Sequence, residues 1–283
     1  MSESAELAGQ DWQAWVGRKE TIRERLAPDR VAALGATLGI EGNHAAGAPL
    51  PPGWHWIFFN RFVPREGLGT DGHPKRGGFL PPVSLPRRMW AGGRLTYHKP
   101  LIVGGEGVRE STILKVEAKS GRAGKLVFVT VNHSIACDGV ACITEEQDIV
   151  YREAAAPGTP APAGVPAPSD ARWSEEFRPD TVLLFRYSSL TSNGHRIHYD
   201  QAYARAEENY PDLVVHGPLT ATLLQGFAQS SAVKPLKSFE FRGVSPLFVS
   251  SPFQLQGKGD GAALDLWASG PNNTLAMRAS AQV

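Results

Sequence analysis

Two groups of segments alternate apolar and polar residues with the two-residue period of half-buried β-strands. The first group is joined by the turn-forming sequences SGRAG and DG and covers residues 108–118, 125–137 and 141–152. The second group lies near the end of the chain and covers residues 238–243, 252–258, 262–268 and 275–279. The pattern therefore predicts one antiparallel meander in each half of the chain.

Segments with helical spacing of apolar residues precede both meanders. They are residues 11–26, 28–38, 201–209 and 219–231. For the second of these helices, Asp29 lies near the start and Gly39 is a typical stop signal. Short apolar runs at residues 54–59 and 182–187 are predicted to be strands, and the glycine- and proline-rich residues 71–90 are predicted to form a long ordered loop.

The order of these elements is the same in both halves, although no residue-level repeat is visible. An antiparallel sheet wrapped around a central helix or loop segment, occurring twice, is an α+β double hot dog. Residues 154–171, AAAPGTPAPAGVPAPSDA, have no hydrophobic period and are predicted to be a semi-extended linker. This linker separates an N-terminal hot-dog half, residues 1–153, from a C-terminal half, residues 172–283.

Composition removes several classes of protein from consideration. Lys+Arg is 29 and Asp+Glu is 28, so the chain has no basic excess, and we expect no nucleic-acid partner. Apolar runs fall far short of the ~18–20 residues that span a bilayer. The polar N-terminus lacks the features of a signal peptide, so we expect a cytoplasmic protein with no membrane partner. Cys137 and Cys142 are expected to be free thiols.

Polar side chains concentrate in a short loop of the C-terminal half, after the predicted strand at residues 182–187 and before the helical segments that follow. Asn193, His195, His198 and Asp200 all lie within eight residues of the chain. Two histidines three residues apart, with an aspartate next along, could in principle bind a metal ion. A metal site needs a third ligand that is clearly placed beside the two histidines, and none is evident, so no metal is expected. His198 is a candidate general acid or base. The more isolated histidines are assigned to structure: His44, His55, His73, His98 and His133.

The sequence His216-Gly217-Pro218 marks the start of the predicted helix that follows this loop. Gly217 has no side chain, so a ligand can approach its N–H closely, and a helix N-terminus offers unpaired N–H groups with a partial positive charge. These features are those of an oxyanion hole. A plain Gly-Pro helix start remains the alternative.

The loop and the helix start together resemble the (R)-specific enoyl-CoA hydratase, or MaoC-like dehydratase, superfamily. The hydratase motif of that family is matched in order and spacing by Tyr187, Leu190, Thr191, Ile197, His198, Asp200, Tyr203 and Ala204, and its helix start by Val215, His216 and Gly217. The sequence departs from the motif in two respects, because its catalytic Asp is Asn193 here and its Asn-Pro is His195-Arg196. Asn cannot take up a proton as Asp can.

The string from Thr191 to Asp200 is similar to one branch of that superfamily, the two-domain hydratases and dehydratases that act on itaconyl-CoA, mesaconyl-C4-CoA or 3-hydroxyacyl thioesters. Residues 77–104 and 145–153 resemble the same branch, so the likeness covers nearly the whole chain. The resemblance implies a double hot dog in which the N-terminal half lacks the catalytic motif and completes the fold and the CoA tunnel. It also implies a homodimer.

The resemblance implies addition of water across an α,β-unsaturated acyl-CoA thioester, or the reverse. His198 is then the acid or base, Asn193 positions the water, and the Gly217 N–H holds the thioester oxygen. Asp200 either orients His198 or is a structural carboxylate of the loop. His195, Tyr199 and His216 are assigned to substrate binding. CoA is part of the substrate, and no separate cofactor is expected.

A dicarboxylic acyl group would need a further anion site. Arg196 is the first candidate because it lies two residues before His198, and Arg87 and Arg88 are the next, since a guanidinium binds a carboxylate through two parallel bonds. Three alternatives remain: a 3-hydroxyacyl-thioester dehydratase of fatty-acid metabolism, a hot-dog thioesterase, and a non-catalytic acyl-CoA-binding module. The predicted helix at 219–231 has no carboxylate, which disfavours the thioesterase.

Overall fold

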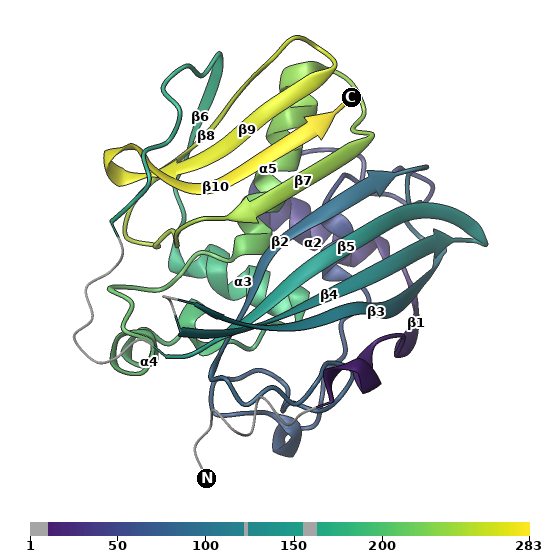
Figure 1. The fold of residues 1–283 in the computed structure, drawn as a ribbon. Helices are drawn as coiled ribbons and strands as arrows, with labels where there is room; N and C mark the ends of the chain where they lie inside the picture. Colours follow the sequence, from purple (N-terminus) through teal and green to yellow (C-terminus); the bar gives the residue numbers. More distant parts are fainter. Residues whose placement is uncertain (1–10, 122–123, 155–162) are drawn as a thin grey trace.

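The computed structural model describes residues 11–121, 124–154 and 163–283. Ten strands form one antiparallel sheet in the order β1-β3-β4-β5-β2-β7-β10-β9-β8-β6 (Figure 1). The first half contributes β1 Lys19–Arg25, β2 Arg87–Tyr97, β3 Glu106–Gly121, β4 Gly124–Cys137 and β5 Val140–Arg152. The second half contributes β6 Trp173–Phe177, β7 Ser238–Gly243, β8 Phe253–Gly259, β9 Ala263–Gly270 and β10 Thr274–Gln282.

From the central strand to the edge of the sheet, the strands of both halves follow the same order. The first is β2-β5-β4-β3-β1, and the second is β7-β10-β9-β8-β6. The two central strands join the halves through a continuous antiparallel register from Gly92↔Arg242 to Thr96↔Ser238. The expected α+β double hot dog is confirmed, with the two halves fused into one sheet.

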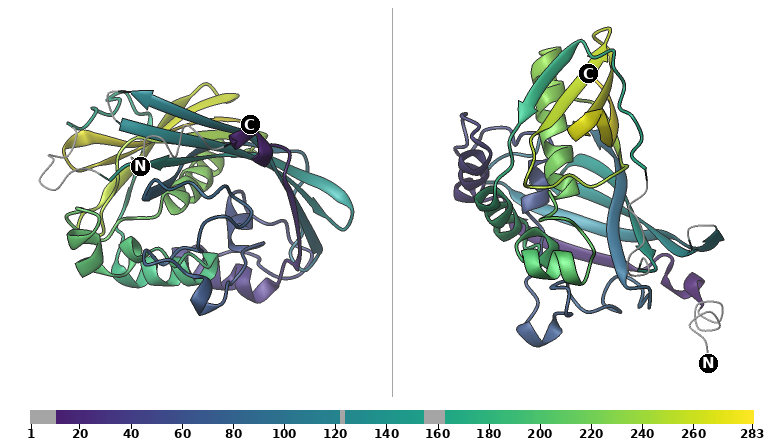
Figure 2. Two further views of the ribbon diagram at one scale, coloured as in Figure 1. Left: turned by 60° about the horizontal axis from the view of Figure 1, so that its bottom comes forward. Right: turned by 90° about the vertical axis from the view of Figure 1, so that its left-hand side faces the viewer.

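The helices lie on the concave side of the sheet, which curves around them (Figure 2). They are α2 Pro28–Leu38, α3 Thr181–Thr191, α4 Gln201–Ala206 and α5 Gly217–Ala232. α5 is the central helix of the second half, and nine of its residues are buried against the sheet. The predicted helices at 28–38, 201–209 and 219–231 are confirmed to within a few residues, and Gly39 ends α2 in the left-handed conformation.

The first half has a short buried segment in the corresponding place. The 3₁₀ helix η2, Trp54–Ile57, is buried along its whole length. His55 Nε2 and Trp56 Nε1 both donate hydrogen bonds to Glu145 of β5, at 2.9 Å each. The predicted strand at 54–59 is therefore wrong: a tight turn, begun by Gly53 in the left-handed conformation, directs two donors at one buried carboxylate.

Two other predictions at the start of each half are wrong. Residues 11–26 form the 3₁₀ helix η1, Trp12–Trp15, and then β1, which pairs with β3 along its whole length. Residues 182–187 lie in α3, because Asp180 caps that helix and the apolar run has one solvent-facing side. Strands β2 and β6 were not predicted, and β2 takes up the last residues of the predicted loop 71–90.

The later part of the predicted linker packs on the second half. Ala167 is buried with Trp267 and Leu275, and Pro166 forms an isolated bridge with Thr274. Residues 155–162 lie outside the described residues. Elsewhere, Cys137 and Cys142 are buried free thiols, as predicted. Among the described residues, no helix is long and apolar enough to cross a membrane.

Candidate active site

His198 lies at the end of the 3₁₀ helix η4, Arg196–His198, and its side chain is buried. Its Nδ1–H donates a hydrogen bond to the carbonyl oxygen of Val214, at 2.7 Å. This bond fixes the tautomer, so that Nε2 carries the lone pair of a base. Burial lowers the pKa of His198 to about 3, against the opposing effect of the Val214 hydrogen bond, so the ring is neutral near pH 7.

His216 stacks on His198, with ring centroids 3.6 Å apart and an interplanar angle of 20°. It is the N-cap residue of α5 and is fully buried. Its Nε2 is hydrogen-bonded to the Ser188 hydroxyl of α3 at 2.8 Å, and burial holds its pKa well below the ordinary range. A neutral imidazole from the start of the central helix therefore forms one wall for the His198 ring.

Gly217 follows directly as the first residue of α5. A Cβ added at this position would meet no heavy atom of the described residues within 4 Å. Its N–H belongs to the group at a helix N-terminus that has no partner within the helix. The space beside the Gly217 Cα is therefore open, next to His216.

Asn193 lies in the loop between α3 and η4 and organises that loop. Its Oδ1 accepts a hydrogen bond from the His195 backbone N–H at 3.0 Å, and its own N–H donates to the Ser188 carbonyl at 2.9 Å. Asn193 also lines a cavity of about 330 Å³. The Asn193 side chain therefore reaches this cavity while its Oδ1 holds the loop.

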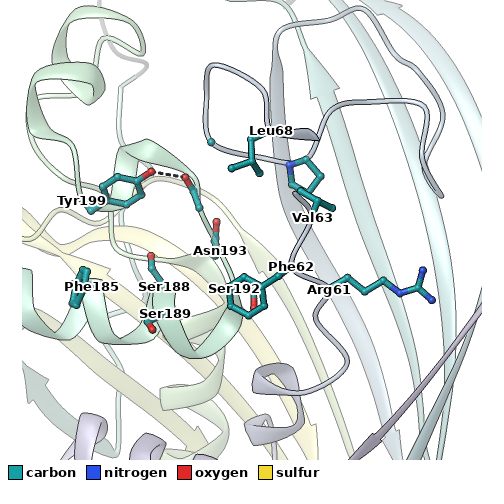
Figure 3. A pocket seen from close by; sticks show the side chains of 13 residues that line it. Arg61, Phe62, Val63, Leu68, Phe185, Ser188, Ser189, Ser192, Asn193 and Tyr199 are labelled. Carbon is teal, nitrogen blue, oxygen red and sulfur yellow. Dashed lines mark hydrogen bonds between the residues drawn. The ribbon is translucent and has the colours of Figure 1, made fainter. Parts of the chain in front are cut away.

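This cavity lies between α3 and the loop that follows η2, as Figure 3 shows. One wall comes from the first half and is apolar apart from Arg61: Phe62, Val63, Leu68 and Pro74. The other comes from the second half and carries hydroxyl and amide groups: Ser188, Ser189, Ser192, Asn193 and Tyr199. The Tyr199 hydroxyl donates a hydrogen bond to the Gly194 carbonyl at 2.9 Å, and Tyr199 lines this wall.

His195 and Glu208 form a buried pair next to His198. His195 Nε2–H donates to Glu208 Oε1 at 3.0 Å, and the two side chains are 10 % and 6 % exposed. Arg87 reaches the other carboxylate oxygen of Glu208 at 2.6 Å. Burial alone would raise the pKa of Glu208, but the His195 hydrogen bond and the Arg87 charge bring it below its ordinary value. Glu208 is therefore ionised near pH 7.

Asp71 and His73 join the same cluster from the first half of the chain. The His73 and His195 rings lie 4.2 Å apart between centroids, and His73 Nδ1–H donates to Asp71 Oδ2 at 3.0 Å. Burial lowers the pKa of His73 to about 4. Sequence reasoning assigned His73 to structure and did not single out Asp71. An Asx turn at Asp71, whose Oδ1 accepts the His73 N–H, was the one local signal.

Asp71, His73 and His195 are also the described residues whose types suit a metal ion, and their ligand atoms lie within 4.8 Å of one another. Each of these side chains is already hydrogen-bonded within the protein. His73 bonds to Asp71, and His195 bonds to Glu208. Arg87 adds a positive charge at the Glu208 end. We therefore assign these side chains to a hydrogen-bonded network.

Asp200 does not contact His198 and serves the loop. Its Oδ1 accepts the N–H of Tyr203 as the cap of α4, and its Oδ2 pairs with Arg196 at 2.7 Å. Arg196 also donates to the Thr70 carbonyl and lies over the Tyr203 ring. Of the two alternatives for Asp200, the geometry therefore supports the structural one, and the Arg196 guanidinium is engaged within the protein.

The two remaining arginines lie at the start of β2, not in the preceding loop where the sequence pattern placed them. Arg87 is paired with Glu208, as described above. Arg88 lies opposite Tyr151 of β5, and its charge contributes to lowering the pKa of His73 after the larger effect of burial. Within residues 11–121, 124–154 and 163–283, Arg88 has no carboxylate within 4.0 Å.

Comparison with known proteins adds sequence relatives to this geometry. The family model for hydroxyacyl-thioester dehydratase type 2 matches residues 53–249. The mesaconyl-C(4)-CoA hydratase of Chloroflexus aurantiacus is 46 % identical over 281 residues, which cover 98 % of this chain and 99 % of that protein. The mitochondrial hydroxyacyl-thioester dehydratase type 2 of Schizosaccharomyces pombe is 33 % identical over 241 residues, which cover 73 % of this chain and 77 % of that protein.

A solved MaoC-like dehydratase structure is similar in fold. It superposes with a TM-score of 0.71 at 16 % identity and covers 96 % of this chain and 98 % of its own. At this identity, the match shows the fold alone. The match extends across both halves and not only across the part that carries the histidine loop.

Proposed function

The chain belongs to the hydroxyacyl-thioester dehydratase type 2 family of MaoC-like hydro-lyases, and from this premise we propose that it hydrates a short dicarboxylic enoyl-CoA such as mesaconyl-C4-CoA. The observation that carries the proposal is the 46 % identity to a mesaconyl-C(4)-CoA hydratase over almost the full length of both chains. The product would be citramalyl-CoA. The dehydration of a 3-hydroxyacyl thioester, the activity in the name of the yeast relative, is the alternative.

The chemistry follows from the placement of three groups. His198 Nε2 takes a proton from water, whose oxygen then bonds to Cβ of the substrate. The electron pair of the double bond moves toward the thioester oxygen, which the Gly217 N–H holds as negative charge develops, and Cα then gains a proton. The Asn193 amide positions the water, since it can both donate and accept hydrogen bonds.

Turnover is tested by the ultraviolet absorbance of the enoyl-thioester with mesaconyl-C4-CoA, itaconyl-CoA and crotonyl-CoA. We expect loss of the chromophore, a product heavier by one water, and the fastest rate with mesaconyl-C4-CoA. Saturable binding without turnover of any substrate would favour the acyl-CoA-binding module. Release of free CoA would favour the thioesterase.

The role of His198 predicts that His198→Ala lowers kcat by about 10²–10⁴-fold, because the water then has no base. His98→Ala is the matched control: that ring pairs with Thr144 on the surface and should leave kcat unchanged. Thermal unfolding of both variants shows whether the fold is kept. A His198→Ala enzyme with a near-normal rate would remove the central element of this mechanism.

We assign Arg88 to an anionic group of the substrate, because its guanidinium has no carboxylate partner within the described ranges. Arg88→Gln should raise KM for mesaconyl-C4-CoA by about tenfold, as expected for one lost charge-assisted contact. If the group bound is the acyl carboxylate, KM for crotonyl-CoA stays unchanged. If it is a CoA phosphate, both KM values rise together, and an unchanged KM for both removes the assignment.

A further inference from the structure

Hydration requires two proton transfers, one from water and one to Cα, and Asn193 cannot take part in either. The inference that follows rests on the proposed function. We propose that His195, positioned by Glu208, is the second proton-carrying group of the site. In this arrangement the His195–Glu208 pair carries the proton. In the hydratase motif that this loop resembles, the Asp at the position of Asn193 has that role.

The first support is the pairing of His195 with Glu208. Their hydrogen bond is 3.0 Å long, and both side chains are nine-tenths or more buried. A carboxylate that accepts one ring N–H fixes the orientation of the imidazole and stabilises the imidazolium form. Arg87 and Glu208 are joined in turn at 2.6 Å, so the carboxylate itself is held in place.

The second support is the position of His195 relative to the other groups of the site. Its ring stands perpendicular to His198, with centroids 5.7 Å apart. The Asn193 side chain accepts a hydrogen bond from the His195 backbone N–H. Asn193 cannot carry a proton, but in this way it holds the loop segment that contains His195. Among the described residues, the His195 hydrogen-bond pattern leaves Nδ1 without a protein partner.

The third support is the opposite side of the ring. His73 lies 4.2 Å from His195 and is itself bound to Asp71. The charged and titratable groups around His195 are Asp71, His73, Arg87, His198, Glu208 and His216, and the Arg88 charge acts on His73. His73 is neutral near pH 7 because burial lowers its pKa to about 4. The His73 ring therefore adds no positive charge of its own beside His195.

The water proton goes to His198 Nε2 and the water oxygen bonds to Cβ, while the double-bond electron pair moves into the enolate. The imidazolium of His195 gives its proton to Cα as the enolate returns to the thioester. His198 then passes the proton it received to His195, so one water is added and both histidines are restored. Dehydration runs through the same steps in reverse.

The closing experiment exchanges the two groups. His195→Asn should lower kcat by about 10²-fold or more, the loss expected for a general acid, with little change in KM. Adding Asn193→Asp to this variant restores a carboxylate at position 193, and the double variant should recover at least about tenfold of the lost rate. A purely structural role for His195 gives no such recovery. A double variant no faster than His195→Asn would overturn the proposal.

Glu208→Gln provides a readout of its positioning role. Without the carboxylate, the protonated form of His195 is less stable, so the alkaline limb of the kcat profile should move to lower pH. Glu207→Gln is the neighbouring control and should leave the profile in place. A lower rate in Glu208→Gln with no movement of the limb would mean that Glu208 is structural, and would overturn the pair.

The wild-type assay separates this inference from the proposed function. Absence of turnover in the wild-type enzyme would overturn the proposed function, and this inference with it. Turnover in the wild type that persists in His195→Asn would overturn this inference alone. Thermal unfolding of each variant confirms that the rates refer to folded protein.

Discussion

Burial decides the charge of three histidines in this protein, His73, His133 and His198, more than their neighbours do. His73, His133 and His198 have pKa values lowered to about 4, 4 and 3, and burial is the largest cause in each case. His73 and His198 belong to the candidate site, and His133 is a buried residue of β4 whose Nδ1 is hydrogen-bonded to the Ser111 hydroxyl. A neutral imidazole is the form that a general base needs, so the dry interior prepares His198 for its proposed role.

The same shifts predict a loss of stability in acid. A histidine that is neutral when folded takes up a proton near pH 6.5 when unfolded, so its contribution is present above that pH and is lost as the pH falls toward 4. Each such histidine lowers the free energy of unfolding by about 1.4 kcal/mol for every pH unit across that window. Urea unfolding at about pH 7 and about pH 5 measures the drop, and His133→Gln should make it smaller. An unchanged drop in the variant would contradict the assignment.

At the scale of elements, the misassigned α3 shows how an apolar run can belong to either type of structure. Leu183, Leu184 and Tyr187 face the core, whereas Val182 and Phe185 are 62 % and 64 % exposed. The helix is set by Asp180, whose carboxylate accepts the Leu183 N–H at 2.7 Å. A six-residue apolar segment carries too little periodicity to show this, because helix and strand both fit it.

The cap gives a prediction for α3. Asp180→Ala should lower the free energy of unfolding by about 1 kcal/mol, because one N–H at the helix start loses its partner. Asp29→Ala is the matched control, since Asp29 lies in the first turn of α2 without capping it. Chemical unfolding of both variants checks this. Equal losses would show that the carboxylate acts through its charge alone.

At the scale of the whole molecule, the site exists only where the halves meet. Asp71, His73 and Arg87 come from the first half, and His195 and Glu208 from the second. The halves are held in register by the pairing of β2 with β7, and by the Tyr97 hydroxyl, which donates to Gln225 of α5. Disturbing the joint should therefore affect both stability and turnover.

Gly92 tests this joint. A Cβ at Gly92 would lie 2.5 Å from the Phe241 carbonyl oxygen of β7, so Gly92→Ala must shift the two central strands. We expect a loss of about 1–3 kcal/mol in stability together with lower turnover. Gly243→Ala on the facing strand is the control, because its Cβ would meet its nearest atom at 3.6 Å. Thermal unfolding and kcat are measured together, and a stable, active Gly92→Ala enzyme would contradict a rigid joint.

The sequence by itself determined the two meanders, the central helix α5 and the loop that carries Asn193 and His198, because period, turn residues and motif spacing are local properties of the chain. It also indicated the family, through the spacing of that loop from the helix start. Only the tertiary structure decided that His73 and Glu208 border His195, and that Asp200 pairs with Arg196 and not with His198. Such contacts join segments more than a hundred residues apart or turn on side-chain direction, and no local pattern records either. Burial, which keeps His73 and His198 neutral near pH 7, exists only in the folded chain.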